Sequence, residues 1–254
     1  MTVMDAAARY DSYWSEREPS RTRARSRSRA ALALGLLGVR MPLASRSRAA
    51  ADSSPHATMQ SLLEVGCGPG WALEVFRDAG FRARGVDVSP AAAALASERG
   101  LVVDLVDIER AALDPRALGA APGFDVVVAL EVLEHLVDPV AALAALRGAL
   151  APGGALVVSL PNEFHLLRRL AVLCGRPGFG GHDDPHLRYF DDARARRLFA
   201  AAEMRVVARR SDSLVPPRRA WLRRLTAPFH ALSPGLLSIA HVYLLETNRE
   251  RVER

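Results

Sequence analysis

Short apolar runs alternate with helix-like segments through the middle of the chain. Segments 61–65, 81–88 and 124–130 have the length of buried strands, and a helix-like stretch rich in Ala or Leu follows each of them. Segment 124–130 is apolar on both faces, as expected of a parallel strand covered by helices on both sides. This alternation from residue 61 to 160 predicts an α/β fold with a doubly wound sheet. Residues 131–154 are interpreted as one helix that ends at a proline.

The pattern is less regular beyond residue 162. We expect a helix, a Gly-rich loop, a capped helix from Asp191, a sixth strand from Met204, an insertion at 211–239 and a last strand that runs antiparallel. The expected architecture is therefore a seven-stranded, mostly parallel, Rossmann-like sheet with N-terminal helices and a helical insertion before the last strand. Residues 1–60 form the predicted leader and linker, and residues 61–254 form one domain.

Charge and cysteine content narrow the class of protein. The chain of 254 residues has no Lys and a net charge of +6, and its Arg excess lies in residues 1–60 and 204–254. We interpret this excess as a solvated basic surface and expect no nucleic-acid partner. Two cysteines give no disulfide framework, which favours a reducing, cytoplasmic location. Residues 20–40 lack a clear cleavage site, so no signal peptide is expected, and no run reaches the roughly 18 apolar residues of a transmembrane helix.

Glycines at alternate positions follow the first strand. In the stretch SLLEVGCGPG, residues 61–70, they permit positive φ and close approach of a ligand, and the N–H groups of the next helix point toward it. The loop therefore predicts a nucleotide-like ligand. A dinucleotide fingerprint would need a third glycine at position 71, which is Trp71, so NAD is disfavoured. Asp87, at the end of the second strand, can accept both hydroxyls of a ribose.

The string E-V-G-C-G-P-G resembles motif I of the class I S-adenosylmethionine-dependent methyltransferases. With D-V-V-V-A-L-E-V-L-E-H-L-V-D-P, L-A-P-G-G-A-L-V-V-S-L-P-N and H-L-R-Y-F-D-D-A, the similarity extends to about residue 210. It is greatest to the subgroup of ubiquinone-biosynthesis O-methyltransferases and MetW-type proteins. The resemblance implies S-adenosylmethionine as cofactor, with Asp104 as a rival to Asp107 near the adenine. The implied cofactor-binding residues are Glu64, Gly66, Cys67, Gly68, Gly70, Asp87, Asp107 and Ile108.

The expected reaction is methyl transfer to a small-molecule acceptor, at oxygen in preference to nitrogen. His135 lies just beyond the expected strand at 124–130 and is the expected catalytic base, and Glu131 is expected beside it. The alternative role of His135 is to cap or brace the start of a helix. Two rival functions stay open: a MetW-like accessory protein that binds the cofactor and stimulates a partner, and a methyltransferase for lipid-linked or nucleic-acid substrates.

A metal site is a further hypothesis. On one helix, Glu131, Glu134 and His135 would share a face, and a fourth ligand could come from His165, His182 or His186. The same string is similar to a magnesium site in certain RNA 2′-O-methyltransferases, so Mg²⁺ is the expected ion if carboxylates dominate. Relatives without a metal share the string, so the hypothesis is secondary.

Three other segments have two readings each. The insertion carries Trp221, Leu222, Leu225 and Phe229 at near-helical spacing, beside Arg218, Arg219, Arg223 and Arg224. It fits peripheral contact with a membrane, but packing over the sheet edge is favoured. The loop with His182, Asp183, Asp184 and His186 is either a lid or a surface loop. Tyr10, Tyr13 and Trp14 are expected to pack on the domain or to cover the cofactor.

Overall fold

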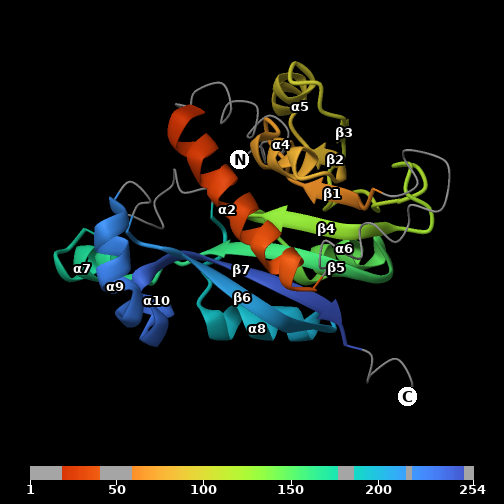
Figure 1. Ribbon diagram of the computed structural model, residues 1–254. Helices are drawn as coiled ribbons and strands as arrows, with labels where there is room; N and C mark the ends of the chain where they lie inside the picture. The colour runs from red at the N-terminus through yellow and green to blue at the C-terminus, as the bar shows by residue number, and fades with distance from the viewer. Residues whose placement is uncertain (1–18, 41–58, 177–185, 216–218, 249–254) are drawn as a thin grey trace, which may run out of the picture.

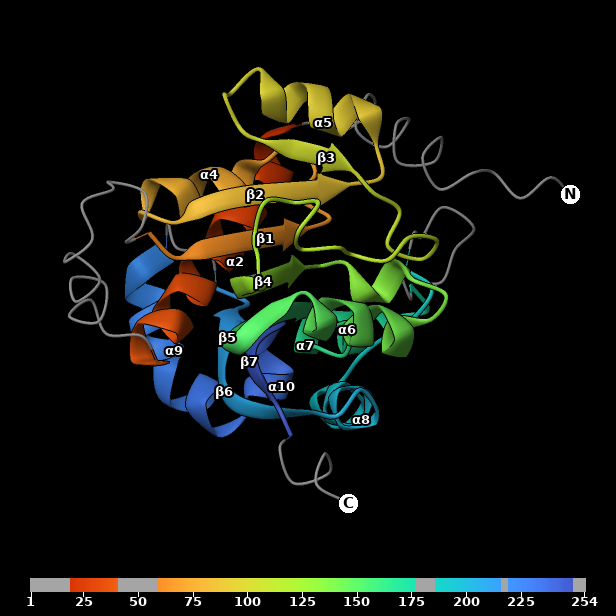
Figure 2. The same cartoon turned by 90° about the vertical axis from the view of Figure 1, so that its right-hand side faces the viewer.

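A computed structural model describes residues 19–40, 59–176, 186–215 and 219–248. Its centre is a seven-stranded sheet in the order β3-β2-β1-β4-β5-β7-β6 (Figures 1 and 2). β7 pairs antiparallel with β5 and β6, and the other neighbours pair in parallel. This confirms the predicted fold class. The strands are β1 (Ser61–Val65), β2 (Arg82–Asp87), β3 (Val103–Leu105), β4 (Phe124–Leu130), β5 (Leu150–Pro161), β6 (Met204–Ser213) and β7 (Ser238–Thr247).

Helices cover both faces of the sheet because its central strands are apolar on both sides. In β4, Val126 and Val128 belong to one core cluster, while Val127 and Ala129 belong to the other. Side chains of α2, α4 and α5 complete the first cluster, and those of α6 and α8 complete the second. These helices are α2 (Pro19–Arg40), α4 (Trp71–Asp78), α5 (Pro90–Ser97), α6 (Pro139–Gly148) and α8 (Asp192–Ala201).

Helix α2 is part of the globular unit. Ala30, Ala33, Leu36 and Leu37 are buried in its contact with the sheet. Residues 19–40 of the expected leader thus pack on the domain. Tyr10, Tyr13 and Trp14 lie outside the described residues.

The single helix predicted over residues 131–154 is wrong. Glu131 has φ +57°, Leu133–His135 form only a 3₁₀ turn (η1), and α6 begins at Pro139 with Asp138 as its N-cap. The cap explains the break, because the Asp138 carboxylate accepts the N–H groups of Val140 and Ala141 and fixes the helix start there. The helix also ends at Gly148, before β5.

The insertion forms α9 (Ala220–Leu232) and α10 (Pro234–Leu237), and α7 (Leu166–Leu173) follows β5. All three helices lie at the end of the sheet where β5 and β6 finish (Figure 1). Trp221, Leu225 and Phe229 are 70%, 65% and 64% exposed, so these three do not pack over the sheet edge as expected, whereas Leu222 is partly buried. None of the described helices is long and apolar enough to cross a bilayer.

Candidate active site

The glycine loop follows β1 and turns back on β2. Gly66, Gly68 and Gly70 have φ of 66°, 52° and 79°, conformations that an L side chain rarely adopts. The N–H groups of Gly66 and Cys67 both donate to the carbonyl of Val86, at 2.8 and 3.2 Å. These bonds fix the loop at the carboxyl end of β1, where parallel sheets of this class bind their ligands.

Asp87 braces this loop from β2. Its Oδ2 accepts the N–H of Gly68 at 2.7 Å, and its Oδ1 accepts the N–H of Ser89 at 2.9 Å. A carboxylate offers about four acceptor positions, so these two bonds do not by themselves exclude a contact with ribose hydroxyls. The predicted ribose contact of Asp87 is thus compatible with its bracing role.

Glu64 places a buried carboxyl group beneath the loop. Its side chain is 2% exposed, and its Oε2 has no hydrogen-bond partner among the described residues. Burial, and then the charge of Asp87, raise the pKa of Glu64 well above its ordinary value. A buried carboxyl with an unsatisfied oxygen is stabilised by a cation, so this site fits the positively charged methionine end of S-adenosylmethionine.

Cys67 faces away from solvent in the same loop. Burial raises the pKa of its thiol, and the nearby charges of Glu64 and Asp87 raise it further. A Cβ on Gly85 would lie 2.6 Å from Cys67 Sγ, so the glycine in β2 provides the space for the thiol. A thiol with a raised pKa is a poor nucleophile, which leaves Cys67 as a packing residue of the loop.

Of the two acids near β3, Asp107 suits a ligand better. Asp104 forms a two-bond ion pair with Arg84, with Nε–Oδ2 and Nη2–Oδ1 distances of 2.5 and 2.8 Å. Asp107 caps its own turn, accepting the N–H of Glu109 at 3.0 Å. Ile108 is partly buried against the core beside it. The adenine contacts of Asp107 and Ile108 stay a prediction.

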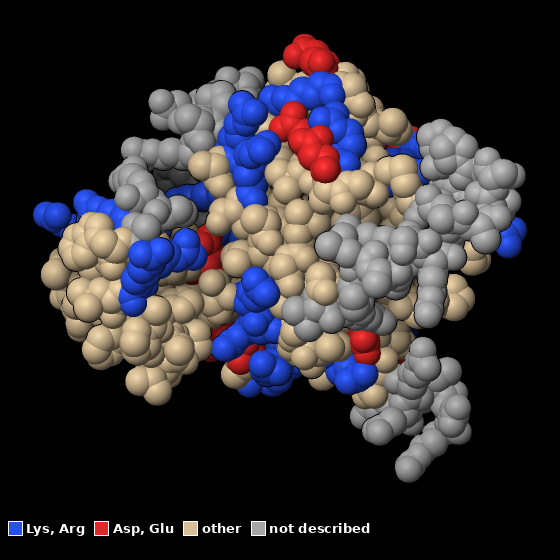
Figure 3. Space-filling view, viewed as in Figure 1, with Lys and Arg blue, Asp and Glu red and all other residues tan. Residues whose placement is uncertain are grey.

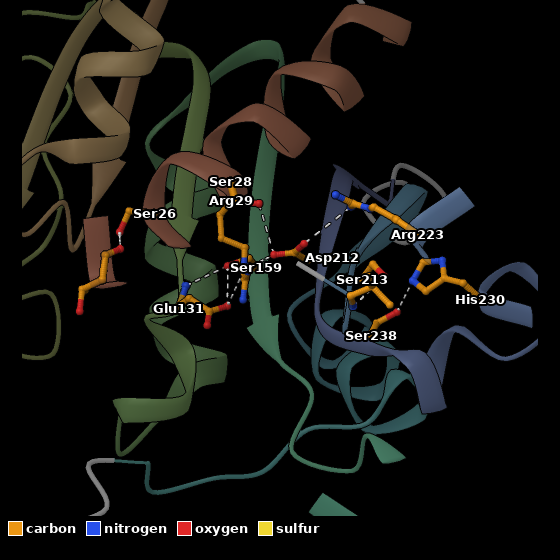
Figure 4. Close-up of polar contacts among 12 residues, drawn as sticks. Ser26, Ser28, Arg29, Glu131, Ser159, Asp212, Ser213, Arg223, His230 and Ser238 are labelled. Carbon is orange, nitrogen blue, oxygen red and sulfur yellow. Dashed lines mark hydrogen bonds and ion pairs between the residues drawn. The ribbon is translucent and has the colours of Figure 1, made fainter. Parts of the chain in front are cut away.

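Glu131 is bound by partners outside the predicted metal site. Ser159 donates its hydroxyl to Glu131 Oε1 at 2.9 Å, and Arg29 Nε lies 3.5 Å from the same oxygen (Figure 4). The left-handed backbone at Glu131 turns its side chain toward β5 and α2. Among the described residues, the candidate cluster joins Glu134 and His135 with His186, one of the expected fourth ligands, and does not include Glu131.

A different cluster forms at the 3₁₀ turn after β4. Glu134, His135 and His186 each offer a ligand atom within 4.8 Å of the others, and the two imidazole rings lie 4.9 Å apart. Glu134 is fully buried, and burial, followed by the charge of Glu131, raises the pKa of its carboxyl. One carboxylate and two imidazoles do not fit Mg²⁺, which prefers oxygen ligands, so we derive no step through that ion. His165 is not in this described cluster, and His182, Asp183 and Asp184 lie outside the described residues.

Sequence reasoning missed the charged network that joins α2 to the site. Arg29 is 3% exposed and forms a close ion pair with Asp212 of β6, while its Nε faces Glu131 (Figure 4). Arg223 of α9 lies 4.0 Å from the other oxygen of Asp212. Arg29 is one of ten Arg in residues 1–60, and only its apolar successors, from Ala30 onward, hint that it is buried.

Comparisons with known proteins agree with this geometry. A family model described as a methyltransferase domain matches residues 23–209. The ubiquinone biosynthesis O-methyltransferase of Paraburkholderia xenovorans is 35% identical over 116 residues, which are 44% of this chain and 49% of that protein. The enzyme of the same name from Psychrobacter cryohalolentis is 35% identical over 125 residues, or 46% and 49% of the two chains. The chain thus spans about half the length of the curated relatives it matches.

Solved structures share the fold at low identity. A S-adenosylmethionine-dependent methyltransferase from Thermotoga maritima, described as a possible histamine N-methyltransferase, aligns with a TM-score of 0.53 and 18% identity, over 85% of this chain and 95% of that one. The CcbJ methyltransferase from Streptomyces caelestis aligns with a TM-score of 0.51 and 18% identity, over 81% and 90%. With most of the chain matched by the family model, the protein belongs to the class I S-adenosylmethionine-dependent methyltransferases.

Proposed function

We propose that this protein transfers the methyl group of S-adenosylmethionine to an oxygen atom of a small-molecule acceptor. One observation carries the proposal: the turn that bears His135 packs directly on the glycine loop. A Cβ on Gly66 would lie 2.6 Å from Val132 Cγ2, and η1 starts at the next residue, Leu133. The loop that would hold the cofactor and the histidine that would accept a proton are thus neighbours.

Glu64, Asp87 and the loop N–H groups would hold the cofactor, which supplies an activated methyl group. Glu64 would face its cationic methionine end, because the carboxyl is buried and one oxygen lacks a hydrogen bond. Asp87 would accept the ribose hydroxyls. Gly66, Gly68 and Gly70 would let the ligand approach the backbone. The protein's remaining tasks are to position the acceptor, exclude water and remove a proton.

His135 is the proposed base, and Glu134 is its proposed positioning residue. His135 Nε2 lies 3.9 Å from Glu134 Oε1, and the His135 side chain is 15% exposed. When the imidazole takes the acceptor's proton, it becomes a cation beside a carboxyl whose pKa burial has raised. Because burial favours the uncharged form of Glu134, its proposed role is to fix the position of the imidazole and not to act as a counter-ion.

Transfer of a labelled methyl group to a panel of hydroxyl, amine and carboxylic acid compounds tests the proposal. We expect hydroxyl compounds to be methylated, with His135→Ala at least about a hundred-fold slower at unchanged cofactor affinity. His230→Ala is the matched control, because His230 lies in the insertion and not in the 3₁₀ turn. Its Nε2 forms a hydrogen bond with the Ser238 hydroxyl at 2.9 Å. Methylation of amines alone, or equal loss in both variants, would contradict the proposal. Tight cofactor binding with no acceptor methylated and a co-purified protein would favour the accessory function instead.

A further inference from the structure

Helix α9 is built with its apolar side toward solvent. Trp221, Leu225, Phe229 and Leu232 recur at helical spacing, and Leu232 is 82% exposed. Helices that pack on a core show the opposite arrangement, with the apolar stripe buried. The partly buried side of α9 includes Leu222 and Thr226, and the Thr226 hydroxyl donates to the carbonyl of Leu222 at 2.8 Å. The outward stripe is therefore surface that the described residues leave uncovered.

Helix α7 has the same character at the same end of the sheet. None of its residues is buried, and Leu167, Leu170 and Leu173 are 56%, 47% and 81% exposed. The side-chain amide of Asn162, just before α7, donates to the carbonyls of Gly235 and Ser238, at 2.8 and 2.7 Å. The start of α7 is thus tied to the end of the insertion, and both apolar helices are fixed to one end of the molecule (Figure 1).

The charged side chains carried by these helices are all Arg, of which Arg168 pairs with Glu163 and Arg223 with Asp212. Residues 164–176 contain three Arg and no acid, and residues 219–237 also contain three Arg and no acid. Arg169, Arg176, Arg219 and Arg224 are exposed. In Figure 3 the surface over α9 and α10 is mostly uncharged, with Arg side chains along its border. An apolar stripe with Arg at its edges is complementary to a bilayer whose headgroups are anionic.

We propose that α9, supported by α7, docks this protein on an anionic lipid bilayer. Exposed Trp, Leu and Phe would enter the boundary between headgroups and acyl chains, and the Arg side chains would contact lipid phosphates. Two copies of this chain meeting through the same face would bring the four exposed Arg of one copy against the same four of the other, so self-association fits the charges poorly. A nucleic acid fits the Arg residues but leaves the apolar stripe in water.

Docking would bring the active site to the membrane. Arg223 of α9 contacts Asp212, Asp212 pairs with Arg29, and Arg29 faces Glu131 beside the 3₁₀ turn (Figure 4). The docking helix is thus connected to the site by three ionic contacts. A lipid-borne acceptor could then reach His135 without leaving the bilayer, a consequence that rests on the proposed function.

Vesicle co-sedimentation tests the docking surface. We expect binding to phosphatidylcholine vesicles that contain phosphatidylglycerol and little binding to phosphatidylcholine alone. Leu225→Glu and Phe229→Glu should each weaken binding roughly ten-fold or more, and Arg224→Gln about five-fold. Val102→Glu is the matched control, because Val102 is 55% exposed and precedes β3 at the opposite edge of the sheet.

Tryptophan fluorescence locates the contact. Of the three tryptophans, Trp71 is buried, Trp221 lies on the proposed surface, and Trp14, outside the described residues, is replaced by Phe in the protein used for this measurement. Anionic vesicles should shift the emission to shorter wavelength, and Trp221→Phe should abolish that shift while co-sedimentation persists. Quenching by lipids with a spin label in the acyl chain should likewise depend on Trp221.

Three results would overturn the docking proposal: no binding to anionic vesicles, binding unchanged in Leu225→Glu and Phe229→Glu, or a dimer in solution that these variants convert to a monomer. The last would assign the face to self-association. S-adenosylhomocysteine binding, measured on the same variants, separates the two proposals. Vesicle binding without cofactor binding would end the proposed function and leave the docking surface, and the reverse result would do the opposite.

Discussion

The two halves of the sheet hold their site residues in different ways. Around β1, β2 and β3 the contacts are local, and Asp87 reaches the N–H of Gly68 across 19 residues of sequence. Around β5, β6 and β7 they are distant, and Arg29 pairs with Asp212 across 183 residues. The half around β1, β2 and β3, the proposed cofactor half, is thus held by local contacts, whereas the half around β5, β6 and β7, the proposed acceptor half, depends on helix α2.

The largest expected effect comes from breaking the distant contact. Arg29→Ala would remove the closest cation from the buried carboxylate of Asp212. We therefore expect the free energy of unfolding to fall by about 4 kcal/mol. Urea denaturation measures this loss. Arg205→Ala, which removes an exposed pair with Glu246, should cost under about 1 kcal/mol. If the two variants were equally stable, the acceptor half would not depend on the buried pair.

The cofactor half is tested by filling its loop. Gly66→Val combines a strained φ with an overly close contact to Val132. We expect the free energy of unfolding to fall by about 3 kcal/mol and cofactor binding to be lost. Gly80→Ala is the control, because its φ is +89° but nothing lies within 4 Å of the added Cβ. That variant should lose only about 1 kcal/mol and keep its affinity. A Gly66→Val protein of normal stability that binds cofactor would refute the role of the loop.

The smallest expected effect is a change in how the stability of the protein depends on pH. Burial, and then the charge of Arg209, lower the pKa of His241 in β7 to about 4, against about 6.5 when unfolded. The folded protein binds fewer protons between these values, so this group makes stability fall as the pH drops, by roughly 2 kcal/mol from about pH 7 to about pH 5. Denaturation of His241→Gln should lack that contribution.

The stability contribution of Glu64, in the cofactor half, depends on pH in the opposite direction to that of His241. Its pKa is raised on folding, so its contribution to stability falls as the pH rises above the value of an unfolded Glu, about 4.3. Glu64→Gln should therefore gain stability relative to the parent as the pH rises, while His241→Gln gains as it falls. Parallel pH profiles of the two variants would contradict this assignment.

The same contrast explains what could be predicted from the sequence. Strand periodicity and the glycine loop depend on neighbours in the chain, so the sheet and the positions of Glu64 and Asp87 followed from residues 61–88. Glu131 could not be placed, because its left-handed backbone depends on Ser159 and Arg29, far away in sequence. The outward face of α9 was equally hidden, since helical spacing shows that an apolar stripe exists but not which side is buried.

Calorimetric titration with S-adenosylhomocysteine tests the central claim, that residues 61–88 form a cofactor site, most directly. We predict saturable binding to the parent protein, at least about a ten-fold loss in Asp87→Asn, and no change in Asp104→Asn, whose carboxylate is engaged with Arg84. Folded parent protein that fails to bind, or equal affinities in the two Asp variants, would contradict the account.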